Sequence, residues 1–327
     1  MVKDKMTEIK TIKACSIWRA LDVLGDKPTL LILESYWLGS RRFSDFHKQT
    51  GLLKTVISDR LQKLLKAGCM QKIPYSDKPL RFEYRGTEKL LDLYPVALSM
   101  LNWENKWNDN HHKIAVRLTH ETCGQATTPI LQNDCCASVI DAREVEWKVG
   151  PGLSDVPLNY QRRRKTTLDV TNRNTALFDS IIDVIGDRWS SLIIRSVFTQ
   201  INHFQDIQDE TQMASNILSE RLLDLVARNI LKRLEVDKRR VQYRLTEKGR
   251  DIYPILMSLL VWGDRWYADE KGPPLVLTHR PCQKPLQMNI ICSACGDKIH
   301  VSDMSFEVAD GGTGRFATNP YRAARTA

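Results

Sequence analysis

Four residues near the end of the chain have the types and spacing of a metal site: His279, Cys282, Cys292 and Cys295. Thiolate sulfur and imidazole nitrogen at this spacing can build a tetrahedral zinc site, and Gly296 permits the tight turn of a Cys-x-x-Cys knuckle. No spare carboxylate or base accompanies the set, so we expect a structural metal rather than a catalytic one. The alternative is buried or redox-active thiols in a small β extension.

A related but poorer set lies earlier in the chain. His120 and Cys123 repeat the spacing of the later His and its first Cys, but the spacing aligns Gln132 with Cys292. Cys135 and the adjacent Cys136 follow. Zinc, the one cofactor that the sequence suggests, is therefore expected at the second extension.

Both sets belong to a repeat that covers most of the chain. The segment LDVLGD (21–26) returns as IDVIGD (182–187), at an offset of 161 residues. LYPVALSMLNWENKW (93–107) returns as IYPILMSLLVWGDRW (252–266), at an offset of 159 with six of fifteen positions identical. Small solenoid units repeat every 20–50 residues or so, about a third of this period or less. A whole domain is therefore written twice, and we expect an internal pseudo-dimer suited to a two-fold target.

The elements that must position these residues follow one order in each copy. In the first copy, apolar spacing predicts helices and then two strands, over 17–25, 29–38, 44–50, 54–67, 70–75 and 80–85. A closing helix begins at Thr87 or Thr246, with a kink or a later start at Pro95 and Pro254. This is the order of a winged helix-turn-helix, whose fourth helix enters the DNA major groove. Another small α+β domain with a solvated helix face is the alternative.

Composition limits the class of protein. The chain has 327 residues, 42% of them hydrophobic, which suits two domains of about 150 residues. A net charge of +9 favours a polyanionic partner. The first ten residues lack the apolar core of a signal peptide, and no apolar stretch approaches the roughly 18 residues of a membrane span. We expect a cytoplasmic protein without a membrane partner, whose eight cysteines serve metal or redox chemistry.

Short motifs in both copies occur in the same order. The first copy has Cys15, RALDVLGDKP, RRFSDF, VISDRLQKLLKAG and FEYRGTEK; the second has IIDVIGDRW, HFQDI, NILSERLLDLVARNIL and YRLTEKG. These motifs resemble the HxlR-type regulators, bacterial winged helix-turn-helix proteins related in shape to MarR. The resemblance covers roughly residues 15–107 and 176–266. It implies a transcriptional regulator, commonly a repressor, that binds operator DNA as a two-fold dimer through its terminal helices, in the cytoplasm at the nucleoid.

The chain departs from the usual single-domain form of that family. Two copies are fused, Pro28 stands where the second copy has Trp189, and Ala176 stands where the first has Cys15. These differences suggest that the two halves have divided roles. The resemblance also makes Cys15 a candidate sensor of oxidants, which requires an exposed thiolate of low pKa. A Cys packed at the start of the first helix is the alternative.

The predicted DNA contacts follow the face of each fourth helix and the wings. They are Arg41, Arg42, Lys54, Thr55, Ser58, Arg60, Lys78 and Arg81 in the first copy, and Ser215, Asn216, Ser219, Arg221, Lys238, Arg239 and Arg240 in the second. Hydroxyl and amide groups can address bases, and the cations of the wings can neutralise phosphates. Arg60 and Arg221 have an alternative role, as anchors for acidic neighbours. Because the two helices differ in sequence, we expect an imperfect palindrome.

The predicted fold class is α+β, mostly α, with two winged helix-turn-helix domains each followed by a Cys/His extension. The division is a first winged-helix domain at 11–110, its extension at 111–150, a linker at 151–173, a second winged-helix domain at 174–270, its extension at 271–310 and a disordered tail at 311–327. The helical spacing of Trp103, Trp107, Trp262 and Trp266 predicts that they pack in the core of each domain or between the halves.

The predicted function is a sequence-specific DNA-binding regulator, and its expected partners are duplex DNA and a small-molecule or oxidant effector. Whether two whole chains also pair as a homodimer, in addition to the internal pseudo-dimer, is left open by the sequence. A redox- or metal-responsive switch that acts mainly through protein contacts is the alternative. An enzyme is not expected, because the sequence has no phosphate loop, no nucleotide fingerprint and no Ser/His/Asp arrangement.

Overall fold

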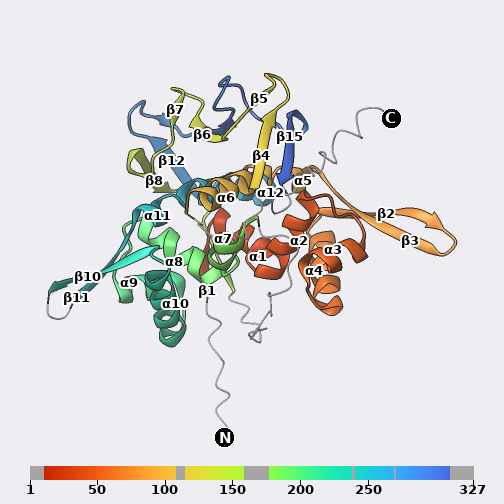
Figure 1. Ribbon diagram of the computed structural model, residues 1–327. Helices are drawn as coiled ribbons and strands as arrows, with labels where there is room; N and C mark the ends of the chain where they lie inside the picture. Colours follow the sequence, from red (N-terminus) through yellow and green to blue (C-terminus); the bar gives the residue numbers. More distant parts are fainter. Residues whose placement is uncertain (1–10, 108–114, 158–176, 238–239, 269, 310–327) are drawn as a thin grey trace, which may run out of the picture.

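The computed structural model describes residues 11–107, 115–157, 177–237, 240–268 and 270–309. Two winged-helix units lie side by side beneath a layer of short strands (Figure 1). Within the described residues, no helix combines the length and apolar character that a membrane span needs. The predicted disordered tail, most of the predicted linker, and Lys238 and Arg239 lie outside the described residues.

The first unit has six helices and a hairpin, in the predicted order. They are α1 (Ser16–Leu24), α2 (Lys27–Trp37), α3 (Phe43–Thr50), α4 (Lys54–Lys66), β2 (Met70–Asp77), β3 (Leu80–Gly86), α5 (Glu88–Leu91) and α6 (Tyr94–Trp107). The closing helix is divided into α5 and α6, as the proline predicted. Pro95 has no N–H to continue a helical ladder from α5, but it is accepted in the first turn of α6.

The second unit repeats this order. Its elements are α7 (Asp179–Ile185), α8 (Arg188–Phe198), α9 (Phe204–Thr211), α10 (Ser215–Ala227), β10 (Leu231–Asp237), β11 (Arg240–Leu245), α11 (Glu247–Arg250) and α12 (Tyr253–Tyr267). The repeat extends to the backbone of the turns. Gly51 ends α3 with a left-handed φ of 65°, and Gln212, at the equivalent position after α9, has a φ of 55°.

The closing helices α6 and α12 pack together and join the two units around one apolar core. Four indole N–H groups cross the junction, each to the other copy: Trp103 to Lys248 O (2.9 Å), Trp107 to Asp251 Oδ2 (2.8 Å), Trp262 to Lys89 O (2.7 Å) and Trp266 to Asp92 Oδ2 (2.8 Å). The four bonds form two equivalent pairs, so the junction has pseudo-two-fold symmetry. The predicted packing of these tryptophans between the halves is confirmed.

A second symmetric contact joins the units at the start of α2 and α8. Asp26 and Asp187 form an antiparallel bridge with each other. Lys27 forms an ion pair with Asp183, and the equivalent Arg188 Nη1 lies 3.0 Å from Asp22 Oδ1. Reciprocal pairs of this kind are what an isologous interface between two subunits would contain. The internal pseudo-dimer predicted from the repeat is therefore present in the fold.

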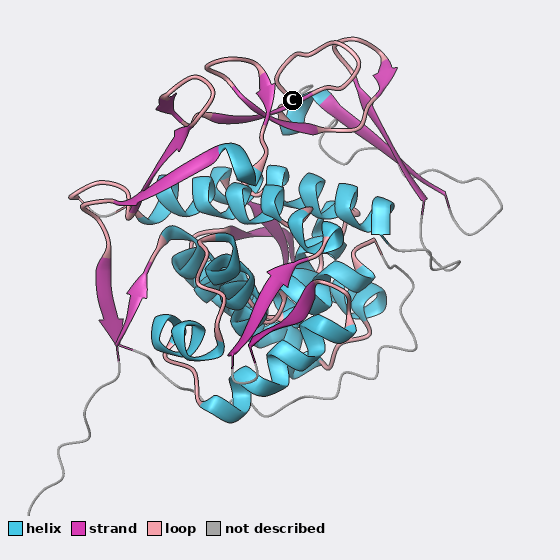
Figure 2. Cartoon of the chain, turned by 90° about the vertical axis from the view of Figure 1, so that its left-hand side faces the viewer, coloured by secondary structure: helices cyan, strands magenta, loops and turns pink. Residues whose placement is uncertain are grey.

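The two extensions interlock rather than fold separately. The inter-copy strand pairs, all antiparallel, are β4 (Ala115–His120) with β15 (Met304–Ala309), β6 (Ile130–Asn133) with β14 (Met288–Ile291), and β8 (Val145–Val149) with β12 (Leu275–His279). The short strands β5 (Gln125–Ala126), β7 (Ser138–Val139) and β13 (Lys284–Pro285) complete three sheets. Figure 2 shows this layer above the long closing helices.

Part of the segment predicted as linker also pairs with the start of the chain. The strand β9 (Ser154–Pro157) is antiparallel to β1 (Thr11–Ala14). Arg19 supports this corner, since its Nη2 donates to Gly152 O at 3.1 Å and its Nη1 to Tyr267 O at 2.5 Å. The segment predicted as linker therefore contains a paired strand directly after the first extension.

Candidate nucleic-acid interface and Cys/His groups

The helices α4 and α10 each bury one face and expose the other. Ile57, Leu61 and Leu64 are buried along α4, as are their equivalents along α10. This i, i+4, i+7 spacing holds each helix on the unit and turns the intervening residues outward. Figure 1 shows both helices at the bottom of the view, on the side opposite the strand layer.

The predicted groove-facing residues are exposed at the start of these helices. Lys54, Thr55 and Ser58 are exposed in α4, as are Ser215, Asn216 and Ser219 in α10. The turn before α4 is fixed by His47, whose Nδ1 lies 2.9 Å from Leu52 O. The N-terminal residues of a recognition helix are the ones that contact base edges in helix-turn-helix proteins. The exposed residues therefore occupy the part of each helix that such contacts require.

Arg60 and Arg221 have the alternative role considered from sequence. Arg60 Nε donates to Asp26 Oδ1 at 2.7 Å, and Lys63 Nζ lies 3.3 Å from Asp26 Oδ2. Arg221 forms the equivalent ion pair with Asp187. Both guanidinium groups are thus directed to the carboxylates that cap α2 and α8, and they anchor the recognition helices to the symmetric junction.

Burial and nearby cations act in opposite directions on Asp26. Burial alone would raise the pKa of this carboxyl group, but Lys63 and Arg60 outweigh it and leave the pKa below its usual value. The side chain also accepts the N–H of Thr29 at 3.0 Å, which caps α2. One carboxylate therefore holds the start of α2 and the recognition helix, at the residue whose backbone bridges to the other half.

The other predicted cations divide between anchoring and exposed positions. Arg41 is half-buried, and its Nη1 donates to Tyr36 O and Ser40 O, both at 2.7 Å. Arg42 is exposed and lies over the Tyr75 ring, 4.2 Å from its centroid. Arg41 therefore holds the end of α2, whereas Arg42 is accessible beside the wing.

The wings extend to opposite sides of the molecule (Figure 1). Lys78 and Arg81 are exposed in the first, and Arg240 is exposed in the second. The first wing also exposes Leu80 and Phe82, which the sequence analysis did not single out. Leu80 and Phe82 alternate with charged residues along the hairpin, and this alternation could have identified them as exposed apolar residues of the wing.

Cys15 is buried at the N-terminal end of α1, with an exposed fraction of 2%. Arg195 from the second copy donates to its Sγ at 3.2 Å, and Arg195 Nη2 lies 2.7 Å from Glu210 Oε1. Burial matches the packing alternative, while the guanidinium is a partner that the sequence did not identify. Cys69 is fully buried, as expected for a core residue, and burial raises the pKa of its thiol to about 11.

The predicted four-residue metal set is not brought together. Instead, His120 and Cys123 of the first copy meet Cys292 and Cys295 of the second. His279 and Cys282 lie in the other group, with Cys136. The prediction assigned all four ligands to one copy, and it was wrong because the strands of the two extensions exchange partners. Sequence spacing alone does not identify which copy supplies the other half of a site.

The first group has closely spaced donor atoms. Cys123 Sγ lies 3.9 Å from Cys292 Sγ, and Cys295 Sγ lies 3.4 Å from His120 Nδ1. Although burial works against it, hydrogen bonds from Thr127 and from the N–H groups of Cys295 and Ala294 lower the pKa of Cys292 to about 6. A thiolate is therefore favoured at this position.

The second group has three donors and an amide. Cys136 Sγ and Cys282 Sγ lie 3.4 Å and 3.3 Å from His279 Nδ1. Hydrogen bonds from Ser138 lower the pKa of Cys136 to about 7. Asn133 Nδ2 donates to Cys136 Sγ at 3.3 Å and lies 3.7 Å from Cys282 Sγ.

Asn133 also corrects the sequence alignment of the two sets. At the offset of 159 that relates the histidines, Asn133 and not Gln132 is equivalent to Cys292. Gln132 takes no part in the second group, and its Nε2 donates to Ala137 O at 2.7 Å. Consistent use of the one offset was the signal that could have identified Asn133.

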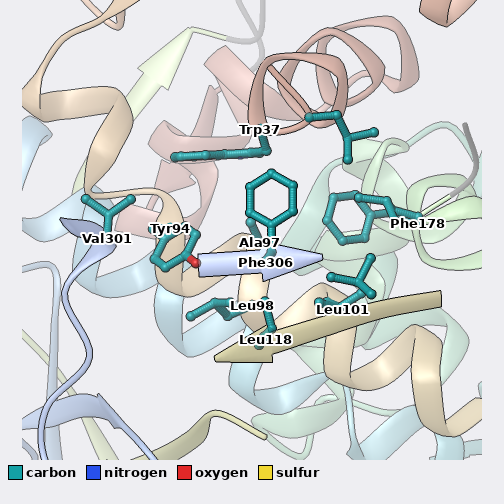
Figure 3. Close-up of a pocket in the computed structure, with 12 residues that line it drawn as sticks. Trp37, Tyr94, Ala97, Leu98, Leu101, Leu118, Phe178, Val301 and Phe306 are labelled. Atoms are coloured by element: carbon teal, nitrogen blue, oxygen red, sulfur yellow. The ribbon is translucent and has the colours of Figure 1, made fainter. Parts of the chain in front are cut away.

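The cavities beside the closing helices include two that differ greatly in volume. One, of about 50 Å³, is lined by apolar side chains that include Trp37, Leu118 and Phe306 (Figure 3). It is well below the roughly 300 Å³ of a small-molecule site. The other, of about 470 Å³, lies between the closing helices and β14 and is lined by Trp262, Arg265 and other residues. Of these two, the second has the volume of a ligand site.

Comparisons with known proteins agree with the geometry of the two units. The HxlR-like helix-turn-helix family model matches residues 23–112 and 184–271. An uncharacterized HTH-type transcriptional regulator of Mycobacterium bovis is 35% identical over 138 residues, 42% of this chain and 87% of that protein. The HTH-type transcriptional regulator YodB of Bacillus subtilis is 30% identical over 91 residues, 27% of this chain and 81% of that protein. The crystal structure of PA1607, a candidate transcription factor, is 30% identical with a TM-score of 0.35, covering 37% of this chain and 87% of that one.

Two winged units with exposed recognition helices define a DNA-binding transcriptional regulator of the helix-turn-helix class, and not an enzyme. The two family matches together span more than half of the chain. The chain therefore belongs to the HxlR-like helix-turn-helix family, with the family domain present twice. Both the predicted family and the predicted fold class are confirmed.

Proposed function

We propose that one chain reads both arms of an imperfect palindrome in duplex DNA and acts as a repressor. The observation that carries this proposal is the exposure of α4 and α10 on one face of an internal pseudo-dimer. In a family that binds as a dimer, two such helices occupy two half-sites. Here the covalent repeat supplies both, so a second chain is not required. Such a role places the protein with the nucleoid in the cytoplasm.

The two arms of the site differ because the two helices differ. Lys54 and Thr55 begin α4, whereas Ser215 and Asn216 begin α10. Asn can form two hydrogen bonds to adenine, and Lys can address guanine or a phosphate. Ser58 and Ser219 are identical and exposed, which supports a shared contact. The site is therefore a palindrome with one adenine-directed arm.

Selection of random duplex DNA by the full chain, at near-physiological salt, tests this proposal. We expect two half-sites whose centres are about 10 base pairs or a multiple apart. The Lys54→Ala/Thr55→Ala variant should relax one arm and the Ser215→Ala/Asn216→Ala variant the other, each with a loss of about 10-fold or more in affinity, from about 1–3 kcal/mol per specific contact.

Lys148→Ala is the matched control for the loss of Lys54. Lys148 is exposed in β8, in the strand layer opposite the recognition helices, so its removal takes away the same charge without touching the proposed interface. Equal loss of affinity in the single variants Lys54→Ala and Lys148→Ala would show only a general electrostatic attraction. No enriched site in any protein would contradict sequence-specific binding by the reduced chain.

We propose further that the regulator responds to an effector. An oxidant acting at Cys15 would have to reach a thiol that is 2% exposed, through local opening at the N-terminal end of α1. The contact of that thiol with Arg195 of the other copy supports this class of effector, since chemistry there would alter the junction between the halves. Repeating the selection after treatment with a thiol oxidant, with Cys15→Ser as control, tests it.

A small molecule in the cavity of about 470 Å³ is the other class of effector, and quenching of Trp262 fluorescence would report its binding. Oxidation that changes protein partners but leaves DNA binding intact would favour the switch alternative.

A further inference from the structure

We propose that the chain binds one zinc ion, at His120, Cys123, Cys292 and Cys295, and that the equivalent second group holds no metal. The ligands come half from each copy, so the ion would join the two extensions. This site differs from the one that sequence spacing predicts. It also stands independently of the DNA-binding proposal.

The donor atoms have the spacing of a tetrahedral zinc site. With Zn–S bonds of about 2.3 Å and Zn–N bonds of about 2.0–2.1 Å, sulfurs lie about 3.8 Å from each other and about 3.5 Å from the nitrogen. Cys123 Sγ and Cys292 Sγ are 3.9 Å apart, and Cys295 Sγ and His120 Nδ1 are 3.4 Å apart. All four donor atoms lie within 4.8 Å of one another. Three sulfurs and one imidazole are a common donor set of structural zinc.

The backbone on both sides of the group is shaped to present two donors. Gly124 follows Cys123 with a φ of 68°, and its N–H donates to His120 O at 2.8 Å. Gly296 follows Cys295 with a φ of 80°, and its N–H donates to Cys292 O at 2.9 Å. Two matched turns, one from each copy, thus face each other across the donor atoms. The left-handed φ explains the glycine at the end of each turn.

The second group has the same frame but lacks one sulfur. Asn133, which is fully buried, replaces the cysteine equivalent to Cys292. Its Oδ1 accepts N–H groups from Gln287 at 3.2 Å and Cys135 at 3.5 Å, which turns its Nδ2 toward the two sulfurs. An amide N–H₂ donates hydrogen bonds and cannot coordinate a cation. It therefore stabilises the sulfurs of Cys136 and Cys282 where a zinc ion would otherwise do so.

A metal ion would therefore crosslink the two copies at one of the two pseudo-symmetric positions and not at the other. The first group lies at the ends of β4 and β14, which belong to different inter-copy strand pairs. An ion bound there would restrain both pairs and close a long loop between residues 123 and 292. In the second group, the hydrogen bonds of Asn133 to Cys136 and Cys282 join the two copies at the equivalent position. The two halves have thus diverged in their extensions as well as in their recognition helices.

Zinc content of the full chain, purified without chelator or metal-affinity tag, tests this proposal. We expect one zinc per wild-type chain. Cys295 and Cys136 are equivalent at the offset of 159, so Cys295→Ser and Cys136→Ser form a matched pair. The Cys295→Ser variant should contain none and the Cys136→Ser variant should retain one. The Asn133→Cys variant restores the missing sulfur and should raise the content to two.

Cobalt binding keeps the test decisive if Cys295→Ser does not fold. Wild-type chain stripped of zinc should take up one Co²⁺ per chain, with the thiolate charge-transfer and visible bands of a tetrahedral site. The Asn133→Cys variant should take up two. A wild-type content of zero with no cobalt uptake would overturn the proposal. So would a content of two, or loss of the ion in Cys136→Ser and its retention in Cys295→Ser.

Discussion

Single carboxylates at the junction carry more than one interaction. The Asp26 carboxylate caps α2 and accepts a hydrogen bond from Arg60 of the recognition helix, and the Asp26 backbone bridges to Asp187 across the pseudo-two-fold axis. Arg60 was therefore placed correctly on α4, but its side chain points inward. The spacing of apolar residues along α4 did not separate Arg60 from the outward-facing residues of that helix. Its acidic partner, Asp26, lies at the start of α2 and could not be assigned from the spacing of α4 alone.

The pH dependence of stability tests the role of Asp26. Its pKa is lowered in the folded chain, so the stability it supplies is present above the pKa of an unfolded Asp, about 3.9, and is lost as pH falls through the lower folded value. At neutral pH, Asp26→Asn should reduce the free energy of unfolding by about 1–3 kcal/mol, because Arg60 and Lys63 lose a charged partner. Urea unfolding between about pH 2 and 7 should show the two proteins converging in acid. A constant difference down to the lowest pH would contradict this role.

At the scale of elements, the sequence predicted the winged-helix order because each element has a local signal. Apolar periodicity marks α4, turn residues mark the wing, and Pro95 marks the division between α5 and α6. The extensions carried no such signal for their partners. The strands β4, β6 and β8 pair with strands more than a hundred residues away. The spacing of residues within a strand does not identify the distant strand with which it pairs. The metal set was consequently assigned to the wrong partners.

The turn that precedes each recognition helix offers a test of the repeat. Gly51 and Gln212 share a left-handed backbone, which is unstrained only for glycine. Gln212→Gly should raise the free energy of unfolding by about 0.5–1 kcal/mol, measured by chemical denaturation. The reciprocal Gly51→Gln should lower it by about 1 kcal/mol. If both changes destabilised equally, the backbone equivalence of the two turns would be contradicted.

For the whole molecule, the fused repeat converts a dimer interface into a folded core. Reciprocal tryptophan hydrogen bonds and the exchanged extension strands tie the two units together on two levels. The repeat in the sequence predicted this pseudo-symmetry, since the tryptophans of the closing helices and the aspartates that accept from them each recur in the other copy. It also predicted where the copies differ, because Lys54 and Thr55 have no match in α10. A fixed pair of unlike recognition helices follows from these two facts.

The number of chains bound to one complete site tests whether a single chain reads both arms. Native mass spectrometry or sedimentation of the protein bound to the selected duplex would count these chains, at protein concentrations below and above the dissociation constant. We predict one chain per two-arm site, and weaker binding to a duplex that carries a single arm. Two chains on every two-arm site, each using one recognition helix, would contradict it.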